Sequence, residues 1–316
     1  MTLIQKFLLT TVALVLAAGV HAANPIPVKV VVVTMFETGE DSGDDAGEFQ
    51  RWNERQKLEK VFPAPHMHHD IHMNEKTGVM GIVTGMGTAN SAASVMALGL
   101  DPRFDLSKAY WLVAGISGFD PADASLGSVA WARFLVDGDL SHEIDAREIP
   151  EDWDHGYFPL FSQGPGDKER LSYSLGEMFE LNGDLFERAY QFTKDMKLPD
   201  HQTLEATRKL YVDYPVGQRK PFVLKGDQLA AMTFWHGEIM NDWANQWVKY
   251  WTRGEGNFVS SAMEDTGTLQ SLTYLHNAGK VDKNRVMVLR TASNYTLPPP
   301  GKSAAEYLLE EQHDSY

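Results

Sequence analysis

The four consecutive valines at 30–33, within the apolar segment 28–34, constrain the fold of this chain more than any other feature. A strand that is apolar and β-branched at every position must be covered on both faces, as in the interior of a parallel or mixed sheet. Further strand-like segments alternate with helix-like ones along the chain; they are residues 78–84, 110–114, 129–136, 222–224 and 285–289. The sequence therefore predicts an α/β fold with helices on the faces of a central sheet.

Two helical regions differ in character. Residues 90–98 are rich in alanine and serine, which predicts a helix packed tightly against its neighbours. Between about 150 and 221 the composition becomes amphipathic and charged, and we expect helices at 171–181 and 185–196. We interpret 150–221 as a helical insertion on a single domain that spans residues 23–316.

The first 22 residues have the three zones of a secretory signal: Lys6, an apolar run over 7–20, and small residues up to Ala22. The sequence predicts cleavage after Ala22. A retained membrane anchor is the alternative, but the apolar run is shorter than the roughly 20 residues that a span needs. No later segment is long enough either, so we expect an exported, soluble protein without membrane insertion.

Composition limits the partners. The chain has 43 acidic and 28 basic residues and a formal charge of −15, which argues against nucleic acid as a partner. It has no cysteine, which excludes disulfides, thiolate zinc sites and iron–sulfur clusters. Export without disulfides favours a bacterial periplasm. Small molecules are the expected partners.

A Gly85-x-Gly87 motif follows the strand-like segment 78–84. The third glycine of a dinucleotide-binding loop is absent, and Asn90 stands in its place. We therefore read the motif as a tight turn between strand and helix, and expect no cofactor.

Histidines concentrate at His66, His68, His69 and His72, with Asp70 among them. Regular strand alternation would place His66, His68, Asp70 and His72 on one face and His69 on the other. Such residues can bind zinc or nickel, or can form a polar strand end. Spacing alone does not give a coordination list, so no metal is assigned.

Two later segments supply candidate ligand-binding residues. The aromatic residues over 243–251 have helical spacing and are expected in the core, whereas Phe234 and Trp235 lie outside that stripe, where either could stack on a purine ring. Glu264 and Asp265 stand where an extended segment enters a helix. Simple helix capping is the alternative for these two carboxylates.

Segments 129–133, 137–148 and 261–268 together resemble the purine nucleoside permease family, and the match covers essentially the whole mature chain. That family is similar in turn to the nucleoside phosphorylase and nucleosidase superfamily, through the blocks 85–93, 113–121, 223–227, 263–264 and 289–294. The resemblance implies a three-layer α/β/α fold around a mixed, partly closed sheet.

The resemblance also implies roles for individual residues. Met263 would pack on the ribose, Glu264 would accept hydrogen bonds from its hydroxyls, and Asn294 would contact the purine, with a preference for 6-oxopurines. The residues placed near the ligand by the same blocks are Gly87, Gly115, Ser117 and Asp265. Glu37 loosely matches the residue that activates water in nucleosidases, although a solvated acid is the alternative.

The chain departs from the phosphorylases at their phosphate site, where Val113 and Ile116 stand at the arginine and hydroxyl positions. The resemblance therefore favours a periplasmic protein that binds inosine, guanosine or adenosine for uptake, with a separate membrane transporter as partner. A purine nucleoside hydrolase that uses Glu37 and Asn294 is the alternative, and a phosphorylase comes third. Many superfamily members form homo-oligomers, and this chain is expected to do so by resemblance.

Overall fold

The computed structural model describes residues 24–172 and 174–314, so the expected signal peptide at 1–22 lies outside the described part. The large central sheet contains β2 (Val30–Thr34), β3 (Lys60–Phe62), β4 (Ile71–Asn74), β5 (Val79–Val83), β7 (Tyr110–Phe119), β8 (Val129–Ala132), β9 (Phe134–Asp137), β12 (Met178–Glu180), β13 (Val223–Lys225), β14 (Asp227–Ala230), β15 (Phe258–Ala262) and β16 (Val286–Tyr295). Two small sheets pair β1 (Ile26–Pro27) with β6 (Phe104–Asp105), and β10 (Ser141–Glu143) with β11 (Tyr157–Pro159).

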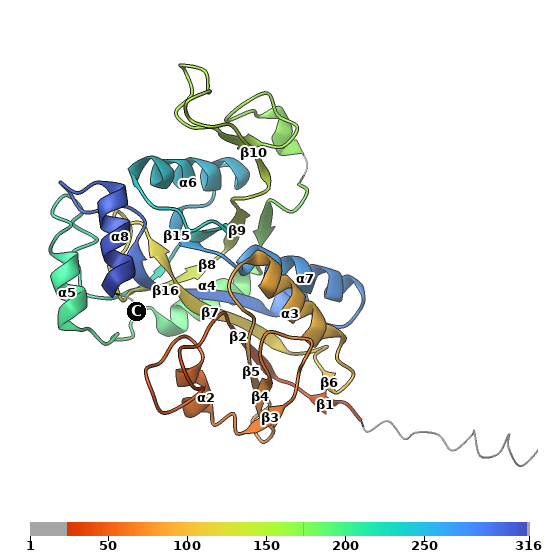
Figure 1. Cartoon of the computed structure of the whole chain (residues 1–316). Helices are drawn as coiled ribbons and strands as arrows, with labels where there is room; N and C mark the ends of the chain where they lie inside the picture. Colours follow the sequence, from red (N-terminus) through yellow and green to blue (C-terminus); the bar gives the residue numbers. More distant parts are fainter. Residues whose placement is uncertain (1–23, 173, 315–316) are drawn as a thin grey trace, which may run out of the picture.

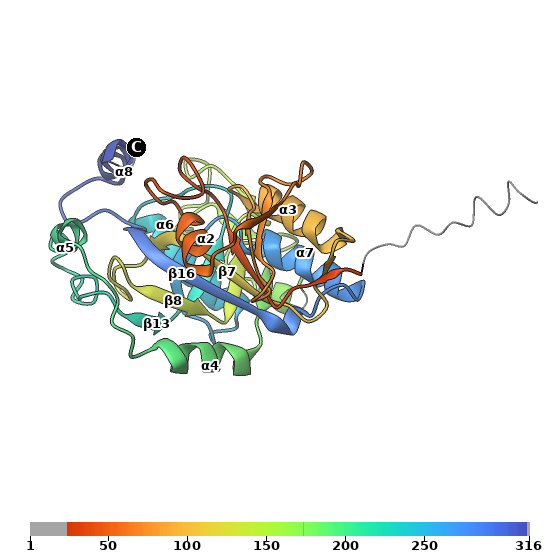
Figure 2. The ribbon, with the colours of Figure 1, turned by 90° about the horizontal axis from the view of Figure 1, so that it is seen from below.

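The helices are α2 (Gln50–Gln56), α3 (Thr88–Leu100), α4 (Gly183–Thr193), α5 (Gln202–Arg208), α6 (Glu238–Trp251), α7 (Asp265–Asn277) and α8 (Ala304–Asp314). Short 3₁₀ turns occupy Glu169–Ser172 and Lys283–Arg285. Helices α3 and α7 lie side by side, and α4 lies against β8 and β13, away from that pair (Figures 1 and 2). The predicted α/β class is confirmed.

The sheet is mixed. Strand β2 is parallel to both β5 and β7, and β16 is parallel to β7, whereas β15 runs antiparallel to β7 and β8 runs antiparallel to β16. Val31 and Val33 are fully buried and Val32 is 2 % exposed, which confirms that the valine run is covered on both faces. One branch of the sheet leaves β7 through β16 and β8, and the other through β15, β14 and β9.

The two branches meet at Arg133, the residue between β8 and β9. The sequence predicted a single strand over 129–136, and this prediction is wrong at Arg133. The chain turns there because Oδ1 of Asp227 accepts the backbone N–H groups of Arg133 (3.1 Å) and Phe134 (2.7 Å). Strand β8 then pairs with β13 and β16, while β9 pairs with β12 and β14. The sheet is thereby partly closed.

Helices α3 and α7 pack closely, as the small residues of α3 predict. A Cβ on Gly99 would lie 2.1 Å from Cδ1 of Leu275, and one on Gly267 would lie 2.3 Å from the carbonyl oxygen of Thr88. Only glycine allows this approach. The contact at Gly267 brings the start of α7 against the start of α3.

The segment 150–221 is less helical than predicted. The expected helix at 171–181 is wrong, because strand β12 forms there and pairs antiparallel with β9. The expected helix at 185–196 is confirmed in α4, which Asn182 caps by accepting the backbone N–H of Leu185 at 3.1 Å. The segment therefore adds an edge strand to the sheet as well as helices.

In the described part of the chain, no helix has the length and apolar character to span a bilayer.

Candidate functional site

The long parallel pair β7 and β16 carries the centre of the site. Residues from Val286 to Ala292 pair in register with residues from Trp111 to Ser117, and Asn294 then pairs with Gly118. The register shift leaves Ser293 as the extra residue of a β-bulge. The bulge shifts the side-chain alternation of β16 between Arg290, which is buried, and Asn294, which is half-buried.

Arg290 is 1 % exposed and is surrounded by carboxylates. Its Nη2 lies 2.6 Å from Oδ2 of Asp265 and 3.1 Å from Oε2 of Glu264, and its Nη1 lies 4.0 Å from Oε1 of Glu48. Nη1 also donates to the carbonyl of Ile116 at 3.0 Å. Burial alone would lower the pKa of Arg290, but Asp265, Glu264 and Glu48 raise it further than burial lowers it. The guanidinium therefore stays charged and holds the three acids together.

Glu48 lies at the end of the loop that follows β2. Its carboxylate accepts the backbone N–H of Met35 through Oε2 and that of Ile116 through Oε1, both at 2.7 Å. Burial raises the pKa of Glu48 to about 7, although Arg290 and the two backbone N–H groups oppose that shift. Near neutral pH this carboxyl group therefore exists in both protonation states, which suits proton transfer.

Glu264 is 4 % exposed and lies where β15 passes into α7. Its Oε1 accepts the backbone N–H of Gly87 at 3.0 Å, and its Oε2 accepts from Arg290 and from the N–H of Met263 at 3.2 Å. Gly87 stands at the N-cap of α3 with φ +89°, a left-handed value that favours glycine. The tight packing of α3 on α7 thus sets the position of the Glu264 carboxylate.

Asp265, the residue after Glu264, is fully buried. Its Oδ2 accepts from Arg290 and, at 2.6 Å, from the side-chain amide of Gln228 on β14. Asp265 therefore positions Arg290, which in turn orients Glu264.

Gly115 is required at this point of β7. A Cβ there would lie 2.5 Å from Nη1 of Arg290 and 2.5 Å from Oε1 of Glu48. Any larger residue would force these two groups apart. The sequence placed Gly115 near the ligand, and the structure places it against the buried charges.

Asn294 lies at the bulge, half-buried. Its Oδ1 accepts from the hydroxyl of Ser293 at 2.9 Å, and its Nδ2 donates to the carbonyl of Tyr295 at 3.3 Å. Ser293 also donates to the carbonyl of Ser117. The hydroxyl oxygen of Ser117, next to this group, is itself buried and has no hydrogen-bond partner among the described residues.

Glu37 lies apart from the Arg290 cluster in its hydrogen bonding. Its carboxylate accepts the backbone N–H of Thr38 at 2.8 Å and also those of Gly47 and Gln50. These bonds join the two ends of the loop 37–48 just before α2. The carboxylate of this loop that lies near Arg290 is that of Glu48, not that of Glu37.

The two aromatic candidates differ in exposure. Trp235 is 8 % exposed and packs in the core against Trp243 and Phe258, with ring centroids 6.0 Å away in each case. Phe234 is 54 % exposed. Phe234 is therefore the ring of this pair with a free face.

Exposed apolar side chains adjoin the charged cluster. Met86 precedes Gly87 and is 60 % exposed, and Ile116, whose backbone binds both Glu48 and Arg290, is 42 % exposed. Cε of Met232, which is 48 % exposed, would lie 3.1 Å from a Cβ on Gly87. A buried polar group beside an apolar rim is typical of a small-molecule site.

Glu48, Arg290 and Gln228 were not among the site residues expected from the sequence. Arg290 carried a usable signal, because a charged residue directly after the apolar run 286–289 is rarely buried unless it is paired. Glu48 carried no sequence signal of burial, since it is one of six acidic residues in a segment whose composition is typical of a solvent-exposed loop. Only the tertiary structure brings it to Ile116 and Arg290.

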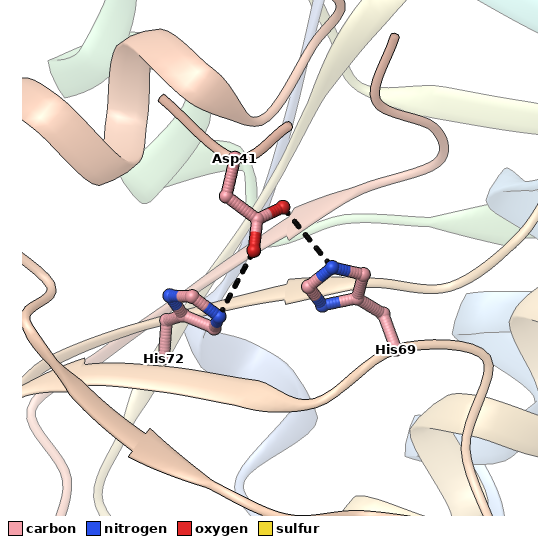
Figure 3. Close-up of side chains that lie close together, drawn as sticks. All are labelled: Asp41, His69 and His72. Carbon is pink, nitrogen blue, oxygen red and sulfur yellow. Dashed lines mark ion pairs between the residues drawn. The ribbon is translucent and has the colours of Figure 1, made fainter. Parts of the chain in front are cut away.

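The histidine segment is not a regular strand. Residues 66–69 form a turn, and β4 begins at Ile71. The predicted shared face of His66, His68, Asp70 and His72 is therefore wrong. His69 and His72 instead both face Asp41 of the loop 37–48 (Figure 3).

Comparison with known proteins shows which family this chain belongs to. The family model described as purine nucleoside permease matches residues 27–316. The chain belongs to the purine nucleoside permease family.

Two similar members of the purine nucleoside permease family are fungal proteins. A purine nucleoside permease of Candida albicans is 33 % identical over 285 residues, which are 89 % of this chain and 68 % of that protein. A probable purine nucleoside permease of Schizosaccharomyces pombe is 33 % identical over 247 residues, 75 % of this chain and 68 % of that protein.

Among solved structures, the 5′-methylthioadenosine/S-adenosyl homocysteine nucleosidase of Helicobacter pylori is similar, with a TM-score of 0.49 at 14 % identity over 92 % of this chain and 100 % of that one. The futalosine hydrolase of Helicobacter pylori has a TM-score of 0.49 at 13 % identity, over 85 % of each chain.

Proposed function

We propose that this member of the purine nucleoside permease family binds a purine nucleoside in the service of nucleoside uptake, with ribose at Glu264 and the base near Asn294. The observation that carries the proposal is the Glu264 carboxylate, which is buried, oriented by three hydrogen bonds and set beside an apolar rim. A carboxylate offers about four acceptor positions, so at least one remains for a sugar hydroxyl. Inosine, guanosine and adenosine are the expected ligands.

The surroundings of Glu264 fit the two halves of a nucleoside. Met263 precedes Glu264 and is half-buried, so its side chain can pack on the sugar. The exposed side chains of Met86, Ile116 and Met232 offer apolar contact. The amide of Asn294 can both donate to and accept from a purine edge.

A hydrolase is the second candidate, and one observation favours it. The carboxyl group of Glu48 has a pKa raised to about 7 by burial and lies on the same guanidinium as Glu264. Such a group can take a proton from an attacking water while Asn294 holds the leaving base. In this mechanism Glu48 takes the role that the family resemblance implies for Glu37.

Phosphorolysis has less support. Val113 is fully buried and Ile116 is apolar, so neither supplies an anion ligand. Arg290 is bound to Asp265 and Glu264, and its charge is already offset by carboxylates. A phosphate group near these acids would be repelled.

Product analysis separates the three activities. The purified mature protein is incubated with inosine, guanosine, adenosine and uridine, with and without phosphate, and the products are separated by chromatography. We expect micromolar calorimetric binding of purine nucleosides without turnover. Base release without phosphate would replace the binding proposal with the hydrolase, and base release only with phosphate would replace it with the phosphorylase.

We further propose that the chain is exported to the periplasm after cleavage behind Ala22, that it acts with a separate membrane transporter, and that it forms a homo-oligomer. The zoned apolar segment at 1–22 supports the export proposal. The intact mass of the protein from the periplasmic fraction of a Gram-negative host tests it, with residue 23 expected as the first residue. An uncleaved mass in the cytoplasmic fraction would contradict export. Light scattering of the same sample gives the oligomeric state.

A further inference from the structure

We propose that Asp41, His69 and His72 form a site for one divalent metal ion, with Zn²⁺ as the best-suited occupant. The three residues come from two separate segments, the loop 37–48 and the turn that leads into β4, and their side chains converge on one point (Figure 3). This site is independent of the nucleoside proposal, because it shares no residue with the Arg290 cluster.

The distances fit a three-residue ligand set. Nε2 of His69 lies 3.0 Å from Oδ1 of Asp41, and Nε2 of His72 lies 3.2 Å from Oδ2 of Asp41. One ligand atom from each of the three residues lies within 4.8 Å of the other two. Metal–ligand bonds of about 2.0–2.2 Å place the ligands of a tetrahedral Zn²⁺ about 3.3–3.6 Å apart, close to the two histidine–aspartate distances. Two imidazoles and one carboxylate fill three positions and leave the fourth for water.

The orientation of His69 is that of a metal ligand. Its Nδ1 lies 2.8 Å from the carbonyl oxygen of Asp70, so this nitrogen must carry the hydrogen and donate it. In the neutral ring the lone pair is then on Nε2, the atom that faces Asp41. A ring hydrogen-bonded to a carbonyl through one nitrogen, with the other nitrogen free, is the usual arrangement of zinc-binding histidine.

Without a cation, the neutral His69 ring and the Asp41 carboxylate would face each other as two acceptors. A neutral His72 could donate from Nε2 to Oδ2 of Asp41, but His69, whose hydrogen is on Nδ1, could donate to Asp41 only as an imidazolium. A single metal ion satisfies all three groups at once.

The surroundings complete the site. The ring of Phe49 packs against both imidazoles, with centroids 5.8 Å from His69 and 5.3 Å from His72, and so limits their movement. On the other side the three residues line an open pocket of about 540 Å³, which admits the ion and an exchangeable fourth ligand. A ligand set that is held on one side and open on the other is typical of a metal site with a free position.

The metal would tie the loop 37–48 to β4. Asp41 lies within this loop, Glu48 ends it, and Phe49 follows as the N-cap residue of α2. A bound ion would therefore restrain the loop at a second point, in addition to the hydrogen bonds of Glu37 at its base. We assign the ion this bracing role.

Calorimetric titration with ZnCl₂ tests the proposal on the mature chain without a polyhistidine tag, after treatment with EDTA and dialysis. The test variants are His69→Ala and Asp41→Asn, both at partly exposed positions where the fold should tolerate the change. His66→Ala is the matched control, because His66 belongs to the same segment but is exposed and outside the cluster. Circular dichroism of each variant verifies the fold.

We expect one equivalent of zinc in the original chain and in His66→Ala, and at least about 100-fold weaker binding in His69→Ala and Asp41→Asn. Zinc should raise the thermal midpoint of the original chain and the control by several degrees, and that of the two variants by much less. The proposal is overturned if the EDTA-treated chain takes up no zinc, or if His69→Ala and Asp41→Asn bind it as tightly as the original chain.

Discussion

The guanidinium of Arg290 donates to the carboxylate of Asp265 at 2.6 Å, and both side chains are buried from solvent. Nη2 of Arg290 continues to Glu264 at 3.1 Å, which links the last strand of the sheet to the start of α7. A buried charge of this kind is tolerated only when it is paired, because the unpaired ion loses its hydration. This pairing fixes the position of Glu264, the residue proposed to bind the ribose.

Removal of Arg290 should therefore be costly. Arg290→Met leaves Glu264 and Asp265 buried without a cation, and we expect a loss of about 3–5 kcal/mol in the free energy of unfolding. Arg285→Met is the control, since Arg285 is partly exposed and its Asp282 partner is 3.4 Å away; it should cost less than about 1 kcal/mol. Urea unfolding measures both. Equal losses would mean that the buried cluster contributes little to the fold.

The stability contributed by Glu48 should depend on pH. Because burial raises the pKa of Glu48 from 4.5 to about 7, its protonated form is favoured in the folded state. This contribution is complete below pH 4.5 and is lost as the pH rises through about 7. The free energy of unfolding of the original chain relative to Glu48→Gln should therefore fall by about 3 kcal/mol between pH 4.5 and pH 8.

Glu205→Gln provides a control of opposite sign. A hydrogen bond from Lys209 lowers the pKa of the exposed Glu205, so its contribution is present above the unfolded pKa and lost in acid. The stability of the original chain relative to Glu205→Gln should rise slightly with pH. Urea titrations at a series of pH values measure both differences. A flat difference for Glu48→Gln would contradict its buried, pKa-shifted state.

Glu264→Ala should separate the sugar from the base. Hydrogen bonds to a charged group contribute about 1.5–3 kcal/mol, so we expect purine nucleoside affinity to fall by about 10–150-fold. Affinity for the free purine base should change by less than about threefold, because the base makes no contact with this carboxylate in the proposed pose. Calorimetry with inosine and hypoxanthine measures the two, and equal losses for both ligands would sink the ribose assignment.

Gly115→Ala tests the packing of the cluster without changing any charge. The new Cβ would lie 2.5 Å from both Nη1 of Arg290 and Oε1 of Glu48, so we expect a loss of about 1–3 kcal/mol from overpacking and a weaker nucleoside affinity. Gly183→Ala is the control, because among the described residues none beyond its own helix backbone and its chain neighbours has an atom within 4 Å of its added Cβ. It should be neutral or slightly stabilising by the helix preference of alanine. Thermal melting and calorimetry compare them.

The sequence determined the elements whose pattern is local. Three elements could be predicted from local sequence patterns: β2 from its valine run, α3 from its small residues and α6 from its aromatic stripe. In each case the structural requirement, which is burial on two faces, close helix packing or helical periodicity, restricts which residues occur in that segment. The family resemblance added Met263, Glu264 and Asn294 as site residues, and these assignments remain predictions.

The tertiary structure decided what depends on distant contacts. The break at Arg133 depends on Asp227, and β12 replaces a predicted helix because the edge of β9 accepts its backbone. Glu48 and Arg290 reach each other only through the fold, and so do Asp41 and His69. The sequence around a charged residue does not show which opposite charge will pair with it in the folded protein. That partner depends on how strands and loops far apart in the sequence pack together.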